Sequence, residues 1–181
     1  MTRSLDQRFD ASRAISWQTA VDAYEDRMKD IIHALKYDRR RSISPRLGAL
    51  MRDAGAEMLR SADCVVPVPL HPWRQFRRGF NQAHELAIHL GPPVIPLLKR
   101  VVHTQSQIEL PRDRRAANVK DAFALAVPAP GSRFPVPGVV VLIDDVATTG
   151  ATLENCAGVL RRSGVIEVRA LTAARVVNAP R

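Results

Sequence analysis

Two adjacent carboxylates lie between an apolar segment and a turn of small, hydroxyl-bearing residues, within the sequence VVVLIDDVATTGAT at residues 139–152. The apolar segment Val139–Ile143 predicts a buried strand, and ligands of open α/β sheets bind at the carboxyl ends of the strands. Asp144 and Asp145 only accept hydrogen bonds when they are ionised, which suits the paired hydroxyls of a ribose. These residues predict a sugar site at the end of the strand.

The turn that follows the aspartates has the composition of a phosphate-binding loop. It precedes a predicted helix at 151–162, and the amides and dipole at a helix N-terminus attract a phosphate. Gly150 would let the backbone approach the phosphate closely. The expected phosphate contacts are Thr148, Thr149, Gly150, Ala151 and Thr152. The alternative is a solvated acidic turn in which Thr152 only caps the helix, but the strand before the aspartates and the turn after them favour a sugar-phosphate site.

Strands and helices alternate along most of the chain. Strands are expected at 64–68, 94–98, 139–143 and 165–170, and helices at 21–37, 44–58, 80–90 and 151–162. In the second helix, Ser44 would be the N-cap and Pro45 the first helical residue. This alternation predicts an α/β fold with a largely parallel sheet.

The composition fits a single globular domain. The chain has 181 residues, of which 46% are hydrophobic and 25% are charged, so a sizeable core and little disorder are expected. No segment approaches 18 uninterrupted apolar residues, and the first residues lack the apolar run of a secretory signal. A cytoplasmic location without membrane association is therefore expected. Cys64 and Cys156 have no CxxC partner, which indicates buried thiols rather than a zinc site or a disulfide.

The formal net charge of +9 favours acidic partners such as phosphorylated metabolites or nucleic acid. Between His71 and Lys120 nine basic residues outnumber three acidic ones, so that this stretch carries +6 of the charge. The basic residues are Arg74, Arg77, Arg78, Lys99, Arg100, Arg112, Arg114, Arg115 and Lys120. No regular period persists between Lys99 and Pro137, and so long a stretch in a compact domain is usually functional or mobile.

Residues 139–152 resemble the signature of type I phosphoribosyltransferases, and the chain is most similar to the ComF family. The ComF pattern also includes IIHALKY at 31–37, VPVPLH at 66–71 and RRGFNQA at 77–83, followed by Gln105, Arg115, Asn118, Ala122 and Phe123. The resemblance covers about Tyr24 to Val177. It implies the type I phosphoribosyltransferase fold, a mostly parallel sheet flanked by helices, with an N-terminal helical hood at 1–60 and a core at 61–177.

The chain departs from the family pattern in two places. ComF proteins commonly begin with a cysteine-rich zinc ribbon, whereas no cysteine precedes Cys64 here. Thr148 stands where base-salvage relatives have an acidic residue that assists the base. Carboxylate-assisted catalysis of that kind is therefore not implied.

The resemblance implies a binding site for 5-phosphoribosyl-1-pyrophosphate (PRPP). The acidic pair would hold the ribose hydroxyls, and the loop after it would hold the 5-phosphate. Val66–His71 would form the pyrophosphate loop, with Pro67, Val68, Pro69, Arg77 and Arg78 as its expected contacts and His71 beside them. Val101–Phe123 would be a mobile loop that closes over the ligand, with Gln105, Arg115 and Lys120 as its candidate residues.

Each of these basic groups also has a structural interpretation. Arg77 and Arg78 could simply be exposed at the start of a helix, and residues 112–115 could be a solvated basic face. Magnesium would arrive bound to the diphosphate, because Mg²⁺ is usually held by few protein oxygens together with substrate phosphates.

Two functions follow as hypotheses. The first is an enzyme that transfers phosphoribosyl from PRPP to a nitrogen acceptor, either a nucleobase or another amine. The alternative is a non-catalytic ComF-type competence module that binds PRPP and also single-stranded DNA or a DNA-processing protein. Aromatic residues make up only 5% of the chain and are not seen interleaved with basic ones, which argues against base stacking. A homodimer is compatible with the family.

Overall fold

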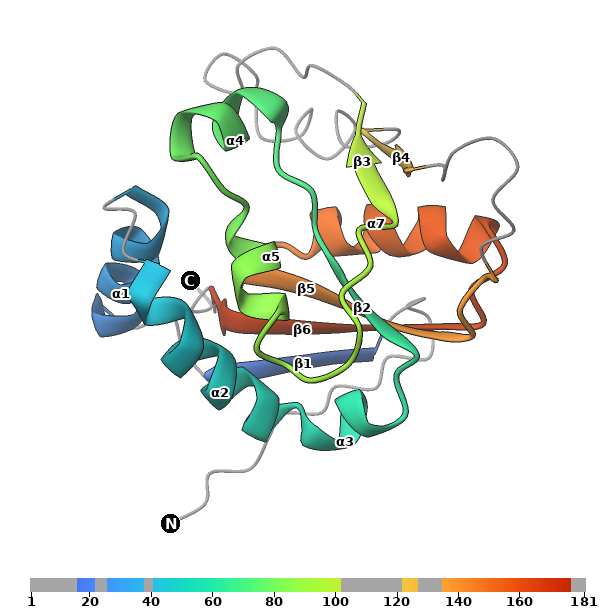
Figure 1. Ribbon diagram of the computed structural model, residues 1–181, viewed down its shortest axis with the longest axis horizontal. Coiled ribbons are helices and arrows are strands. Elements are labelled where there is room, and N and C mark those ends of the chain that lie inside the picture. Colours follow the sequence, from blue (N-terminus) through green and yellow to red (C-terminus); the bar gives the residue numbers. More distant parts are fainter. Residues whose placement is uncertain (1–15, 22–25, 38–40, 102–121, 127–134, 177–181) are drawn as a thin grey trace, which may run out of the picture.

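A four-stranded parallel sheet forms the centre of the computed structural model, which describes residues 16–21, 26–37, 41–101, 122–126 and 135–176 (Figure 1). In spatial order the strands are β1 (Ser16–Val21), β6 (Glu167–Arg175), β5 (Val139–Ala147) and β2 (Cys64–Pro67). Each neighbouring pair runs parallel. The predicted α/β class with a parallel sheet is confirmed.

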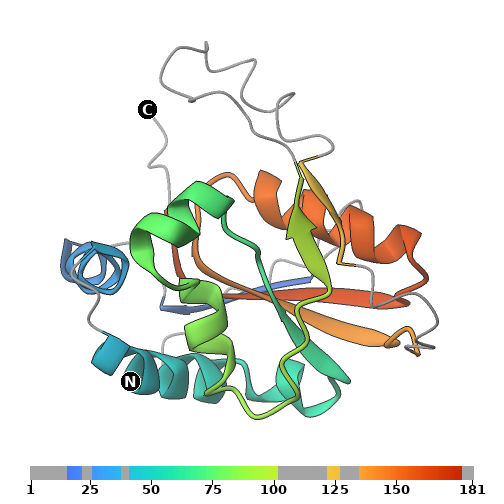
Figure 2. The ribbon, with the colours of Figure 1, turned by 45° about the horizontal axis from the view of Figure 1, so that its top comes forward.

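Helices cover both faces of the sheet, so that the protein has three layers (Figure 2). One face packs against α1 (Asp26–Tyr37), α2 (Ser44–Ala54) and α5 (Gln82–Ala87), while α3 (Ala56–Arg60) precedes β2. The opposite face packs against α7 (Ala151–Arg162) and a two-stranded antiparallel unit, β3 (Leu98–Arg100) and β4 (Phe123–Leu125). The short helix α4 (Pro72–Arg78) follows the loop after β2.

Alternation along β5 explains why one strand contributes to two hydrophobic clusters. Val140 and Leu142 join the cluster on the α7 side, whereas Val141 and Ile143 join the cluster on the α2 side. All four are fully buried. Successive side chains of a strand point to opposite faces, and a continuous apolar run is typical of a parallel strand covered on both faces. The two cysteines are also buried and free, as predicted.

The N-terminal elements differ from the predicted ones. Val21 is the last residue of β1, and the helix begins only at Asp26. The helical period therefore predicted the start of this helix wrongly, and the strand before it was missed. The pairing of β1 with β6 decides the conformation of this segment, because it adds a strand at the edge of the sheet. The segment assigned to the hood thus supplies one strand of the central sheet.

The second helix also begins differently from the prediction. A short 3-10 helix, η1 (Arg41–Ile43), leads directly into α2, so that Ile43 is the N-cap and Ser44 is already helical. Gly55 ends α2, which places Met58 in the separate helix α3. A Cβ atom at Gly55 would lie 2.7 Å from a side-chain carbon of Leu171, so the break in the helix lets the backbone approach the sheet.

The predicted strand at 94–98 is also wrong. Val94 forms a single parallel bridge to Val65, and a strand begins only at Leu98. The predicted helix at 80–90 is confirmed only as the shorter α5. The strands predicted at 139–143 and 165–170 are confirmed, although the second begins only at Glu167, and both extend further toward their carboxyl ends. The helix predicted at 151–162 agrees with α7 at both ends.

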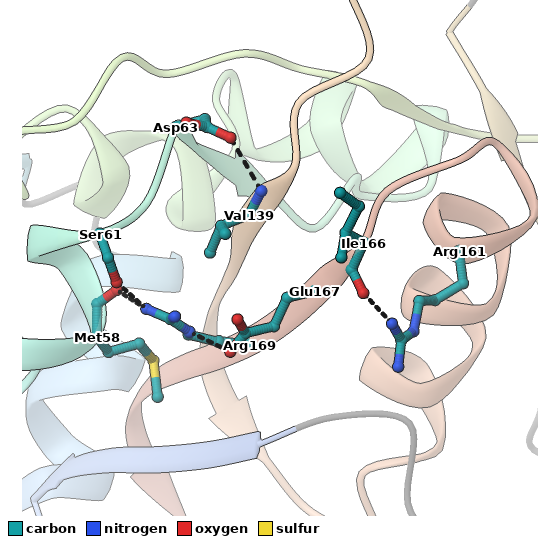
Figure 3. Close-up of polar contacts among 8 residues, drawn as sticks. All are labelled: Met58, Ser61, Asp63, Val139, Arg161, Ile166, Glu167 and Arg169. Carbon is teal, nitrogen blue, oxygen red and sulfur yellow. Dashed lines mark hydrogen bonds and ion pairs between the residues drawn. The ribbon is translucent and has the colours of Figure 1, made fainter.

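Polar contacts join the amino-terminal end of the sheet to α3 (Figure 3). A carboxylate oxygen of Asp63 accepts the N–H groups of Gly138 and Val139 at 2.8 and 2.9 Å. Arg169 of β6 donates to the carbonyl oxygen of Met58 at 2.7 Å and to Glu167 at the same distance. The hydrogen bond from Arg169 lowers the pKa of Glu167. These contacts are structural, because they lie at the end of the strands opposite to the acidic pair. Within the described part of the chain, no helix has the length and apolar character needed to cross a membrane.

Candidate functional site

The acidic pair lies on β5, at the point where the neighbouring strand β2 has already ended. Pro67, the last residue of β2, pairs with Ile143, and the N–H of Val68 donates to the carbonyl oxygen of Ile143 at 2.9 Å. Asp144 and Asp145 therefore lie beyond β2, while β5 continues to pair with β6 through Ala147. The strand is longer than the sequence predicted, but it still carries the pair to the carboxyl end of the sheet.

The two carboxylates are held by the backbone of their own strand. The N–H of Asp145 donates to Asp144 Oδ1 at 2.8 Å, and the N–H of Val146 donates to Asp145 Oδ1 at 2.9 Å. Asp145 is buried and Asp144 is partly buried. Asp145 Oδ2 also lies 2.6 Å from the ammonium nitrogen of Lys36, at the end of α1. The pair is thus preorganised, and one cation already compensates it.

The pKa of Asp144 is raised well above its ordinary value of 3.8. Burial is the largest cause, and the negative charge of Asp145 is the second. The backbone N–H of Asp145 and the cation of Lys36 act in the opposite direction and lower it. Two adjoining carboxylates in a partly buried site cannot both ionise easily. The pair therefore tends to retain a proton on Asp144.

We expect Asp144→Asn to stabilise the protein at neutral pH. The folded protein binds more protons than the unfolded chain from pH 3.8 up to the raised pKa, so its stability falls as pH rises through this range. The variant cannot ionise at this position and should gain a few degrees in melting temperature at pH 7. The gain should disappear at or below pH 3.8, where wild-type Asp144 is also protonated. Thermal unfolding at several pH values measures this, with the exposed Asp53→Asn as the control. An equal gain at all pH values would contradict the shifted pKa.

The loop between β5 and α7 leads into the helix through a glycine N-cap. Gly150 is the N-cap of α7 and has a φ of +83°, a conformation that favours glycine. No side chain of the described residues caps this helix, and Ala151 N–H makes only a long contact, 3.4 Å, to Thr149 Oγ1. Thr148 and Thr149 are exposed. The alternative in which Thr152 caps the helix is wrong, because Thr152 is its second residue.

The predicted pyrophosphate loop follows β2. Pro67 and Val68 are buried, Pro69 is partly buried, and Asn81 donates to the carbonyl oxygen of Val68 at 3.0 Å. His71 Nδ1 accepts the N–H of Trp73 at 3.2 Å and so caps α4. The loop is thus fixed at its start by the sheet and at its end by the cap of α4.

The two arginines predicted beside this loop have neighbours within the protein. The Arg77 guanidinium lies 5.6 Å from the centre of the Trp73 ring, and Arg78 donates to Gln82 at 3.0 Å. Arg77 is exposed, and Arg78 is partly buried. Gln105, Arg115 and Lys120 of the predicted mobile loop lie outside the described residues.

Arg100 is a residue that the sequence reasoning did not single out. It lies on β3, is partly buried, and places its guanidinium 5.3 Å from the centre of the Phe123 ring. Among the described residues, its Nε has no hydrogen-bond partner. Burial lowers the pKa of Arg100, and the nearby cation Arg74 lowers it further. The only signal in the sequence was its place in the basic stretch.

Arg100 and Asp144 both influence the thiol of Cys156 in α7. Burial raises the pKa of the Cys156 thiol, Asp144 raises it further, and Arg100 opposes this effect. Arg100 of β3 and Asp144 of β5 therefore both lie near Cys156 of α7, and Arg74 of α4 lies near Arg100. Such an arrangement suits a ligand that combines a sugar with more than one phosphate. Among the residues that the structure describes, no group of three His, Cys, Asp or Glu side chains could hold a metal ion.

The parallel sheet, with an acidic pair and a glycine-capped helix at its carboxyl edge, is the type I phosphoribosyltransferase fold. The chain belongs to the ComF family. It is 36% identical over 172 residues to competence protein F of Haemophilus influenzae, covering 88% of this chain and 74% of the relative. It is also 34% identical to the DNA utilization protein YhgH of Salmonella typhi, covering 84% and 70%. These relatives confirm the family that the sequence motifs indicated.

Comparison with solved structures gives a more distant likeness. The purine phosphoribosyltransferase from Pyrococcus horikoshii has a TM-score of 0.41 and 16% identity, and the match covers 75% of this chain and 90% of that one. No family model matches the chain.

Proposed function

We propose that this ComF protein binds PRPP at the carboxyl edge of its sheet. The observation that carries the proposal is the position of Asp144 and Asp145 beyond the end of β2, on the strand that leads into the glycine-capped N-terminus of α7. A carboxyl pair accepts hydrogen bonds from a ribose diol, and the N–H groups of the helix N-terminus donate to its 5-phosphate. Sugar and phosphate sites separated by a single short turn match a ribose 5-phosphate.

The diphosphate would lie toward the basic residues Arg74 and Arg100. Arg100 has a guanidinium N–H without a partner among the described residues, and Arg74 is its neighbouring cation. Arginine binds phosphate oxygens through a planar fork of donors. The pyrophosphate loop, residues 66–71, begins at the adjacent end of β2. We assign the diphosphate to Arg74, Arg100 and this loop, with Arg77 and Arg78 as the outer cations.

The proposed reaction transfers the phosphoribosyl group to a nitrogen atom. A bond forms between the nitrogen and the anomeric carbon, and the bond from that carbon to the diphosphate breaks, so that pyrophosphate leaves with the bonding electrons. A proton on the acceptor nitrogen is then released. The residues of this chain would act by positioning the ribose and stabilising the departing charge. Thr148 leaves the phosphate loop without the carboxylate that assists the base in salvage relatives.

A magnesium ion would reach the site bound to the diphosphate. Mg²⁺ prefers oxygen ligands and usually combines one or two carboxylates with substrate phosphates and water. Here Asp144 and Asp145 are assigned to the ribose hydroxyls, so the diphosphate and water would supply the oxygen ligands of the ion. The ion would neutralise charge on the leaving diphosphate, while the protein supplies the sugar and phosphate contacts.

Release of pyrophosphate tests the enzymatic proposal. Purified protein is incubated with PRPP and Mg²⁺, and nucleobases and simple amines are supplied one at a time while pyrophosphate is measured. Acceptor-dependent release supports a transferase and identifies the acceptor class. Binding of PRPP by calorimetry without release for any acceptor would favour a non-catalytic role for the same site. Absence of PRPP binding would contradict the proposal itself.

One observation favours a second candidate function, the binding of single-stranded DNA. Helix α4 exposes two aromatic side chains to solvent, Trp73 at 60% and Phe76 at 88%. Arg74 and Arg77, both exposed, alternate with them. Aromatic platforms for bases, combined with cations for phosphates, are typical of surfaces that bind single strands. The sequence reasoning missed this alternation within the helix.

We expect the double variant Trp73→Ala/Phe76→Ala to weaken binding of a single-stranded oligonucleotide about tenfold or more, because stacking contributes about 1–3 kcal/mol per base. Fluorescence anisotropy at two salt concentrations measures the affinity and its salt dependence. The loss should be similar at both, since the arginines remain. The control is Ile166→Ala, which truncates another exposed apolar side chain. Ile166 is 74% exposed and lies directly before β6. Equal affinity of the double variant and the wild type would exclude α4 as the binding surface.

A further inference from the structure

Lys36 compensates the negative charge of the acidic pair. Its ammonium nitrogen lies 2.6 Å from Asp145 Oδ2, and the two side chains are only 21% and 11% exposed. Lys36 belongs to the last turn of α1, a helix whose Ile32 and Leu35 are almost fully buried in the core. The lysine therefore reaches the pair from a helix that packing holds in place.

The ammonium lies where a sugar hydroxyl would have to bind. Asp144 Oδ1 and Asp145 Oδ1 already accept backbone N–H groups at 2.8 and 2.9 Å. Asp145 Oδ2 forms an ion pair with Lys36 but accepts no hydrogen bond of regular geometry from the described residues, so three of the four carboxyl oxygens of the pair have an N–H group or a cation beside them. A vicinal diol brings two O–H donors to neighbouring oxygens. A diol that donates to Asp145 Oδ2 competes with the Lys36 ammonium for this oxygen.

We propose that Lys36 is an internal occupant of the ribose site, and that the sugar of an incoming ligand displaces its ammonium from Asp145. This inference rests on the proposed ribose 5-phosphate site. The lysine has a flexible four-carbon stem, so its ammonium can turn away while α1 stays packed. A phosphate without a sugar does not compete with Lys36. The site thereby favours ligands whose phosphate contacts contribute enough binding free energy to offset the loss of the Lys36–Asp145 ion pair.

The test compares two probes by calorimetry, ribose 5-phosphate and inorganic phosphate. Lys36→Met retains most of the stem and removes the ammonium. We expect this variant to bind ribose 5-phosphate about tenfold more tightly than the wild type, because the ligand no longer displaces a charge-assisted contact. Affinity for inorganic phosphate should be unchanged. Arg52→Met is the control for loss of one positive charge, since Arg52 forms an exposed ion pair with Asp53 at 3.6 Å.

A double variant shows whether the gain in affinity for ribose 5-phosphate depends on the carboxylate of Asp145. In Lys36→Met/Asp145→Asn the gain should be absent relative to Asp145→Asn alone, as a double-mutant cycle requires for a direct pair. Ribose 5-phosphate affinity of Lys36→Met equal to or below that of the wild type would overturn the proposal, because Lys36 would then hold the ligand or ignore it. Binding by neither protein would instead overturn the ribose site. Thermal unfolding verifies the fold of each variant, and Lys36→Gln replaces the methionine variant if that one does not fold.

Discussion

Replacing Asp145 with asparagine is expected to weaken PRPP binding by about 30-fold, since a hydrogen bond to a charged group contributes about 1.5–3 kcal/mol. The asparagine oxygen can still accept the N–H of Val146, which Asp145 Oδ1 accepts at 2.9 Å. Its amide nitrogen would replace the oxygen that now faces Lys36. An N–H donor there cannot accept a ribose hydroxyl. Calorimetry with PRPP and Mg²⁺ measures the loss.

The fold of this variant should remain intact. The strand pairing of β5 with β6 involves backbone atoms and does not depend on the carboxylate. Asp53→Asn makes the same change of charge at an exposed position on α2 and should bind PRPP as the wild type does. An Asp145→Asn protein that is folded and binds PRPP with unchanged affinity would remove the acidic pair from the proposed site.

Replacing Arg100 with methionine is expected to weaken binding at the diphosphate end of the site and to leave binding at the ribose end unchanged. Affinity for PRPP should fall about 30-fold or more, because a partly buried guanidinium makes charge-assisted bonds to phosphate oxygens. Affinity for ribose 5-phosphate, which lacks the diphosphate, should change little. The Nε–H of Arg100 has no hydrogen-bond partner among the described residues, and Arg74 lies near it; these two observations motivate this expectation. Competition of the two ligands in one calorimetric series measures both affinities.

The stability of this variant is informative as well. Methionine keeps an apolar stem beside Phe123 and removes a cation whose burial lowers its pKa. We therefore expect the melting temperature to be unchanged or slightly higher. Arg52→Met again controls for net charge. An equal loss of affinity for PRPP and for ribose 5-phosphate would show that Arg100 acts on the whole site rather than on the diphosphate.

The sequence alone determined the centre of the candidate site. Residues 139–152 form a strand, a turn and a helix that are contiguous, so their apolar periodicity, Gly150 and the acidic pair were readable without any distant contact. The basic stretch from His71 onward indicated that anion-binding residues lie there. Its basic residues have no regular spacing, however, so the sequence could not identify which arginines face the site. Gln105, Arg115 and Lys120 remain predictions.

Only the tertiary structure decided which distant residues meet the acidic pair. Lys36 reaches Asp145 from a helix more than a hundred positions earlier in the chain, and Arg100 and Asp144 both lie near Cys156. The same is true of β1, which is a strand because β6 offers it an edge. Local propensity reports the conformation of a segment and the face that it buries. Ion pairs and strand pairing depend on distances across the fold, which no local pattern contains.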